Sequence, residues 1–193
     1  MLKFKLGTKI NLMIIAIILI LSIVIGIVVV DQVKKGIEDV AIEKAKGDLN
    51  LTYAYIDQKY PGGWEIKNNQ LYKGKVAMNN NTDILDEVGK DTGGDTLTIF
   101  QKDTRVTTNV MQDGKRAVGT KASSKVADVV LKQGKNYYGE AMVAGHAYQT
   151  AYMPLKSNDG KTIGILYVGA SQSIIDKTVS SFLKIFIVVL III

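Results

Sequence analysis

Residues 137–169 read YYGEAMVAGHAYQTAYMPLKSNDGKTIGILYVG, and this stretch decides the fold class. Gly145 with His146, and the turn-forming cluster Ser157-Asn158-Asp159-Gly160, divide it into three runs of small, aromatic and β-branched residues. The three runs are Tyr138–Ala144, His146–Leu155 and Thr162–Gly169. No helical period fits them, and their composition favours strands. Short consecutive strands joined by tight turns predict an antiparallel meander.

Two further strands and a helix are predicted ahead of the meander. Asp95–Gln101 and Arg105–Val110 flank Lys102-Asp103, which has the length of a hairpin turn. Ser123–Lys132 has a capping serine at its start and an apolar face of valines, so we expect a short helix there. Together with the meander, these segments predict an α+β fold in which a helix packs on an antiparallel five-stranded sheet.

The first 60 residues predict a membrane helix that continues as a long helix beyond the membrane. Ile10–Val30 carries no charge, and an apolar helix of about 20 residues is enough to cross a bilayer. Three lysines in residues 1–9 place the N-terminus in the cytoplasm. An apolar stripe at helical spacing then runs through residues 31–60, and Pro61 ends it. The stripe consists of Ile42, Ala45, Leu49, Thr52 and Ile56. It covers the sheet, pairs with the same helix of a second subunit, or does both.

The C-terminal residues predict the beginning of a second membrane span. Phe182–Ile193 is apolar apart from Lys184, but its 12 residues are fewer than a span requires. Residues 172–181 predict a helix that leads into this run. We therefore expect the sequence to stop inside the second span.

The composition excludes several classes of function. The chain has no Cys and one His, so a thiolate metal site and a multi-His metal site are both excluded. Most of the formal charge of +6 lies beside the apolar segments, because residues 31–181 contain 20 Lys and Arg against 18 Asp and Glu. We therefore expect no nucleic-acid partner. The sequence contains no convincing nucleophile–His pattern or phosphate-binding loop, so we expect no catalytic residues and no cofactor.

Several stretches resemble one protein family. The runs YYGEAMVAGHAYQTAYMPLK (137–156) and GKTIGILYVGAS (160–171) are similar to the last three strands of single Cache domains. GGDTLTIFQKDTRVTTNV (93–110) and GKRAVGT (114–120) are similar to the first hairpin and the following loop of that family. Single Cache domains are extracytoplasmic sensor domains of methyl-accepting chemotaxis proteins and of some histidine kinases. The resemblance implies a PAS-like sheet with a ligand pocket on one face, a long N-terminal helix and no enzyme activity.

The resemblance and the apolar segments together imply four parts. They are a cytoplasmic N-terminus (1–9), a first transmembrane helix (10–30), an extracytoplasmic single Cache sensor domain (31–181) and the start of a second transmembrane helix (182–193).

Candidate ligand-binding residues lie on the polar face of the expected hairpin. A two-residue turn at Lys102-Asp103 places Phe100 opposite Arg105 and Thr98 opposite Thr107. The other face is apolar and would contain Leu97, Ile99, Val106, Thr108 and Val110. A polar face in a covered sheet serves a small polar ligand or solvent, and Arg105 is the stronger of two candidate cations.

Tyrosines of the meander and one loop arginine complete the candidate set. Tyr148 and Tyr152 share one face of a strand, and Tyr138 lies on the preceding strand. Each combines a flat apolar ring with a hydroxyl, which suits either a small organic acid or ordinary strand packing. Arg116, in the loop at 111–121, either closes over a carboxylate through a bidentate pair or remains a solvated loop charge.

The residues and the resemblance lead to one expected function with two alternatives. We expect the sensor module of a membrane-embedded, homodimeric chemoreceptor, which binds a small solute, a small carboxylate above all. Signal would pass through the second transmembrane helix. One alternative is the sensor of a membrane histidine kinase or cyclic-dinucleotide enzyme. The other is a membrane-anchored interaction module that binds no ligand.

Overall fold

The computed structural model describes residues 5–171 and 173–192 of the 193-residue chain. The chain divides into two compact units. One unit combines Met1–Asp39 with Ser173–Ile193, and the other is Val40–Gln172. Parts of three expected segments lie outside the described residues: residues 1–4 of the N-terminus, residue 172 of the exit helix and residue 193 of the second span.

The first unit contains the apolar parts of two helices. Helix α1 spans Leu6–Lys59 without a break, so the expected long helix is confirmed and ends two residues before Pro61. Within the described residues, α1 is the one helix long and apolar enough to cross a membrane by length and composition, with a mean hydropathy of 3.5 over its most apolar window. Helix α4 spans Ser173–Ile192 and joins the expected exit helix to the second apolar run.

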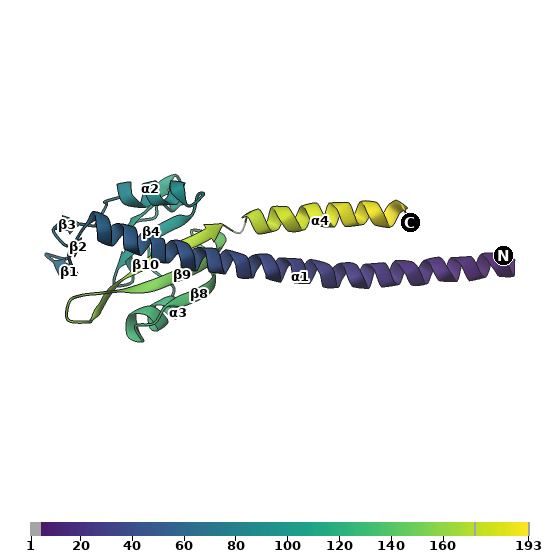
Figure 1. The fold of residues 1–193 in the computed structure, drawn as a ribbon, viewed down its shortest axis with the longest axis horizontal. Helices are drawn as coiled ribbons and strands as arrows, with labels where there is room; N and C mark the ends of the chain where they lie inside the picture. Colours follow the sequence, from purple (N-terminus) through teal and green to yellow (C-terminus); the bar gives the residue numbers. More distant parts are fainter. Residues whose placement is uncertain (1–4, 172, 193) are drawn as a thin grey trace. The chain divides into compact units, whose positions relative to one another are not determined.

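The second unit is built on an antiparallel sheet of five strands (Figure 1). Its strands are β4 (Thr96–Gln101), β5 (Thr104–Thr108), β8 (Tyr137–Val143), β9 (His146–Lys156) and β10 (Thr162–Ser171). Their order is β5-β4-β10-β9-β8, so the hairpin joins the meander through the pairing of β4 with β10. The expected α+β fold, a PAS-like five-stranded antiparallel sheet with a long N-terminal helix, is confirmed.

The β4–β5 hairpin contains a bulge that the sequence prediction missed. Phe100 pairs with Arg105 as expected, but the register then shifts, and Thr98 pairs with Thr108 instead of Thr107. Val106 is the extra residue on β5, and one inserted residue moves every following side chain to the opposite face. The expected pairing of Thr98 with Thr107 is therefore wrong.

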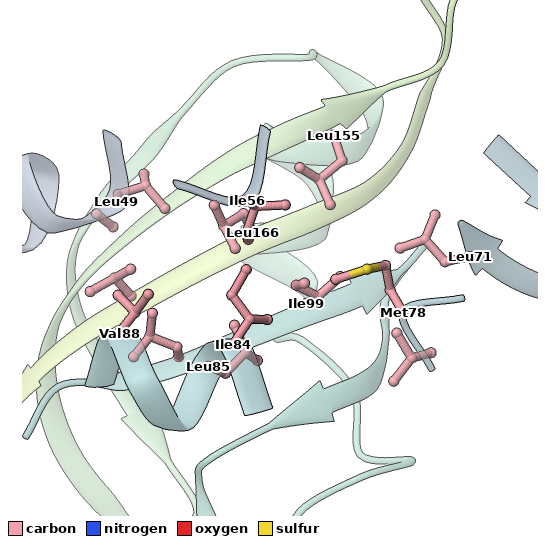
Figure 2. Close-up of a cluster of buried hydrophobic side chains, with 14 of the residues drawn as sticks. Leu49, Ile56, Leu71, Met78, Ile84, Leu85, Val88, Ile99, Leu155 and Leu166 are labelled. Carbon is pink, nitrogen blue, oxygen red and sulfur yellow. The ribbon is translucent and has the colours of Figure 1, made fainter. Parts of the chain in front are cut away.

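One face of the sheet packs against α1 and α2 (Asp83–Asp91) in a cluster that we call the helix-side core (Figure 2). It consists of Ala45, Leu49, Ile56, Trp64, Leu71, Met78, Ile84, Leu85, Val88, Leu97, Ile99, Val106, Ala151, Leu155, Leu166, Val168 and Ala170. The apolar stripe of α1 thus covers the sheet, because Ala45, Leu49 and Ile56 are all buried in this cluster. Burying several such side chains, at roughly 1.5–3 kcal/mol each, outweighs the cost of the glycines in this helix.

The opposite face carries a smaller cluster, which we call the recess-side core. It consists of Phe100, Val110, Ala117, Val126, Val130, Val143, Tyr152, Ile165 and Tyr167. The segment at 123–132 covers part of this face as a short helix, α3 (Ser124–Ala127), followed by a π-helical turn, η1 (Asp128–Lys132). Its Ser123 caps α3 by accepting a hydrogen bond from the Val126 backbone amide, as the sequence predicted.

Short elements frame the sheet. A small sheet of β1 (Trp64–Lys67), β2 (Gln70–Lys73) and β3 (Val76–Ala77) contributes Trp64 and Leu71 to the helix-side core. The expected loop at 111–121 contains a minimal hairpin of β6 (Met111–Gln112) and β7 (Lys115–Arg116).

Candidate functional site

A cavity of about 230 Å³ opens on the recess-side face, beneath the segment at 121–126. We call it the Arg105 recess. Its walls come from β4, β5, the segment before and within α3, and strands β8 and β9. They are formed by Phe100, Arg105, Lys121, Ala122, Ser123, Lys125, Val126, Tyr137, Glu140, Ala141, Met142, Val143 and Tyr152.

Arg105 is the buried cation of this recess, with 7% of its surface exposed. Its Nη1 donates to the hydroxyl of Thr120 at 2.5 Å, which fixes the plane of the guanidinium. Its Nε is buried and has no hydrogen-bond partner among the described residues. Burial lowers the pKa of Arg105 from its ordinary value, although nearby Tyr167 and Tyr152 act in the opposite direction. A buried cation with an unsatisfied N–H favours an anion that accepts from it.

Aromatic rings support and line the recess. The Arg105 guanidinium lies 5.1 Å from the centre of the Phe100 ring, a cation–π distance. The centres of the Tyr152 and Tyr137 rings are 5.9 Å apart in an edge-on pair, and those of Tyr152 and Tyr167 are 4.9 Å apart in a tilted pair. Tyr167 is fully buried, and its hydroxyl lies 2.9 Å from the Thr96 hydroxyl. Burial raises the pKa of Tyr152 to about 12, so its hydroxyl stays neutral at physiological pH.

Two lysines lie at the border of the recess. The ammonium of Lys125 sits 5.3 Å from the centre of the Tyr137 ring. The ammonium of Lys121 donates to Asp103 at 2.9 Å, so its charge is already compensated. The recess therefore combines one buried and unsatisfied cation with a second cation at its border, Lys125.

The comparison with protein families decides the identity of the domain. The family model described as single Cache domain 3 matches residues 76–182, more than half of the chain. The chain belongs to the single Cache domain 3 family. The resemblance found in the sequence is thereby confirmed, and the Cache domain identifies the second unit as a sensor domain.

Two solved structures are similar to this Cache domain. The sensor domain of E. coli DcuS is 15% identical, with a TM-score of 0.43, and the match covers 77% of this chain and 98% of that one. The sensor domain of the V. cholerae histidine kinase DctB is also 15% identical, with a TM-score of 0.39 and coverage of 48% of this chain. That second match spans only 37% of the DctB chain. A comparison with curated proteins gave no match.

Three of the residues predicted from the sequence line the recess of the Cache domain. They are Phe100, Arg105 and Tyr152. Thr98 lies on the same face but is fully buried, with its hydroxyl 2.6 Å from that of Thr108. Tyr148 packs at the edge of the recess-side core, outside the lining residues, and burial raises its pKa.

The other three predicted residues lie elsewhere. Thr107 donates to the backbone carbonyl of Asn81, because the bulge at Val106 turns it toward the helices. Tyr138 is 40% exposed and stacks under the ammonium of Lys46, which belongs to α1. Thr107 is therefore not on the face expected for it, and Tyr138 is not among the residues that line the recess.

Arg116 already has a carboxylate partner within the Cache domain. Its Nη1 and Nη2 donate to the two oxygens of Asp86 at 2.8 and 2.6 Å, and Nη1 also donates to the carbonyl of Thr108. This bidentate pair is internal to the domain: it ties the hairpin of β6 and β7 to α2 and lies outside the recess lining.

Sequence reasoning missed four residues that shape the recess. Lys125 belongs to the correctly expected helix, but nothing in the sequence indicated which of its residues face the sheet edge. Tyr137 and Tyr167 lie within the quoted meander, and both are direct cross-strand partners of Tyr152, so the register of the meander was the available signal. Thr120, in the GKRAVGT run, gave no signal, because its contact with Arg105 depends on the path of the loop.

Proposed function

We propose that this Cache domain binds a small carboxylate in the Arg105 recess and serves as the non-catalytic sensing module of a membrane chemoreceptor. The observation that carries the proposal is the buried Nε of Arg105, which lacks a partner among the described residues. Leaving such a donor unpaired costs roughly 1–3 kcal/mol or more, so an acceptor that enters the recess recovers that free energy.

The geometry of the guanidinium favours a carboxylate over other acceptors. Arg binds carboxylates bidentately through two parallel N–H groups. Thr120 already accepts from Nη1, so the edge formed by Nε and Nη2 is the edge left for a ligand. Two oxygens of one carboxylate match such an edge, whereas a single hydroxyl or amide oxygen fills half of it.

The volume and the lining limit the size of the ligand. About 230 Å³ falls below the roughly 300–1,000 Å³ of sites for drug-sized molecules, so an acid of a few carbon atoms fits best. The apolar walls include Val126, Ala141 and Val143, which suit a short aliphatic chain. The Tyr152 ring closes one side.

The path from the recess toward the second apolar helix supports a signalling role. Strand β10 carries Tyr167 beneath the Tyr152 ring, and the strand ends at Ser171, two residues before α4 begins. A ligand changes the signal only if it binds two states of this region unequally. The apolar first part of α1 and the lysines at its N-terminal end support an extracytoplasmic location of the Cache domain and a membrane anchor. A homodimeric receptor is part of the same proposal.

Titration calorimetry on the full chain in lipid nanodiscs tests the proposal. The probes are acetate, propionate and pyruvate, each compared with an uncharged amide such as acetamide or propionamide. We expect saturable binding of at least one acid and at least tenfold weaker binding of its amide, because a charge-assisted pair is lost. Absence of saturable binding for all three acids, or equal affinity for acid and amide, would contradict the carboxylate assignment.

A further inference from the structure

A second cavity, of about 280 Å³, lies on the opposite face of the sheet. It sits where the β4–β5 turn meets the β1–β2 turn, and Val106 of the helix-side core forms its apolar floor. Its other lining side chains are polar and include Asn69, Asn79, Gln101 and Thr104. No lining residue is shared with the Arg105 recess.

Hydrogen bonds to the backbone fix the orientation of two amides in this cavity. The Oδ1 of Asn79 accepts from the Leu71 amide at 2.8 Å, which leaves both N–H donors of its Nδ2 without a partner among the described residues. The Nε2 of Gln101 donates to the Asn69 carbonyl at 3.2 Å. The Oε1 of Gln101 is buried and has no partner in the part of the chain that the structure describes. Two residues of the cavity lining therefore have unused hydrogen-bonding groups: the Nδ2 of Asn79 is a free donor, and the Oε1 of Gln101 is a buried, unsatisfied acceptor.

The charges around the cavity are either compensated or turned to solvent. The carboxylate of Asp103 accepts from Lys121 at 2.9 Å and from the Thr104 hydroxyl at 3.1 Å. Lys102 is exposed, and its backbone has a left-handed φ of +52°, which is uncommon for a lysine. A charged ligand would gain no buried counter-ion here. Hydroxyl groups, which both donate and accept, match a lining that offers both an unsatisfied amide oxygen and a free amide N–H₂.

We propose that this second cavity binds a small neutral polyhydroxylated solute, a monosaccharide or polyol, through the Oε1 of Gln101 and the Nδ2 of Asn79. The volume is sufficient for a single sugar ring, and Val106 supplies an apolar surface for its C–H groups. The assignment stands apart from the carboxylate function, because it uses neither Arg105 nor the recess. The Cache domain would then have two ligand sites of different chemistry on its two faces.

Titration calorimetry on the full chain in nanodiscs, with D-glucose, D-ribose, myo-inositol and glycerol as probes, tests this site. We expect saturable binding of at least one probe. Gln101→Met removes the acceptor, and Asn79→Asp removes the donor while it keeps the oxygen that accepts from Leu71. Each substitution should weaken binding about 5–10-fold, the effect of one lost hydrogen bond.

Two controls separate this site from its surroundings. Gln112→Met makes the same change at an exposed glutamine of β6 and should leave the affinity for the probe unchanged. Arg105→Met should also leave it unchanged, although we expect this substitution to weaken carboxylate binding.

The fluorescence of Trp64, the single tryptophan, reports whether each variant is folded. If Gln101→Met does not fold, the affinity of Asn79→Asp decides the outcome. If the cavity holds only water, none of the probes will show saturable binding, and that result would overturn the assignment. Wild-type affinity for the probe in Asn79→Asp would overturn it as well.

Discussion

The hydroxyl of Thr120 accepts a hydrogen bond from Nη1 of Arg105 at 2.5 Å and itself donates to the carbonyl of Ala117 at 2.8 Å. The backbone of the same loop is also hydrogen-bonded to β5. The Arg105 amide donates to the Thr120 carbonyl, and the Gly119 amide donates to the Arg105 carbonyl, both at 2.8 Å. This loop thus holds the guanidinium in one plane and leaves its buried Nε without a partner among the described residues.

Substitution of Thr120 tests whether this hydrogen bond positions Arg105 for a ligand. Thr120→Val keeps the shape of the side chain but removes the acceptor, so the guanidinium loses its fixed orientation. We expect carboxylate affinity to fall about 5–10-fold by calorimetry. Thr120→Ser keeps the hydroxyl and should restore most of the affinity. Wild-type affinity in Thr120→Val would show that the bond has no positioning role.

Gly169 is a position where the sheet tolerates no side chain. A Cβ at Gly169 would lie 2.1 Å from the Tyr167 hydroxyl oxygen and 2.8 Å from the Thr96 hydroxyl oxygen. Gly169→Ala should therefore lower the free energy of unfolding by about 1–3 kcal/mol, as overpacking of a core does. Urea unfolding followed by the fluorescence of Trp64 measures the change.

A double-mutant cycle identifies the cause of that loss. Tyr167→Phe removes the nearer clash, so Gly169→Ala should cost less in the Phe background than in the wild type. Gly47→Ala, at a helical glycine with nothing within 4 Å, is the control and should leave stability unchanged or raise it. Equal costs of Gly169→Ala in both backgrounds would mean that the Tyr167 hydroxyl is not the obstacle.

A buried carboxylate predicts a specific dependence of stability on pH. Asp95 is 4% exposed, and burial, followed by the neighbouring Asp48 carboxylate, raises its pKa to about 6 from the ordinary 3.8. Lys44 opposes this shift, because its ammonium lies 2.6 Å from both carboxylates. A raised pKa in the folded state means that the folded protein binds the proton more tightly than the unfolded chain.

The sign of the effect follows from that difference. The stabilising contribution of Asp95 is fully present below about pH 4 and is lost as the pH rises through about 6. Between pH 4 and 7, the free energy of unfolding should fall by on the order of 1 kcal/mol more in the wild type than in Asp95→Asn. Urea titrations at several pH values measure both slopes. Parallel slopes would indicate that Asp95 titrates normally.

The elements with strong periodic patterns were predictable from the sequence. The stripe of α1 was assigned to a helix because Ala45, Leu49 and Ile56 recur at helical spacing, and these residues are buried as expected. The meander followed from its turn residues and its β-branched runs. The pairing of β4 with β10, which closes the sheet, involves strands more than 60 residues apart, and no local pattern encodes it.

The candidate site was predicted only in part, for reasons that lie in single residues. Arg105 and Phe100 precede the bulge, so the simple hairpin register placed them correctly. Thr107 follows Val106, and a bulge without a glycine leaves no mark in the sequence. The partner of Arg116 is Asp86, 30 residues earlier on α2, and such a long-range ion pair has no local signal.

The most direct test of the central claim compares two arginine variants of the full chain with the wild type. The measured quantity is the affinity for acetate, propionate or pyruvate. Arg105→Met removes the cation of the recess, whereas Arg116→Met removes an arginine already paired with Asp86 outside it. We predict that Arg105→Met weakens carboxylate binding by roughly 10–100-fold and that Arg116→Met leaves it within about twofold of the wild type. Carboxylate binding that survives in a folded Arg105→Met variant, or that is lost in Arg116→Met instead, would contradict the account.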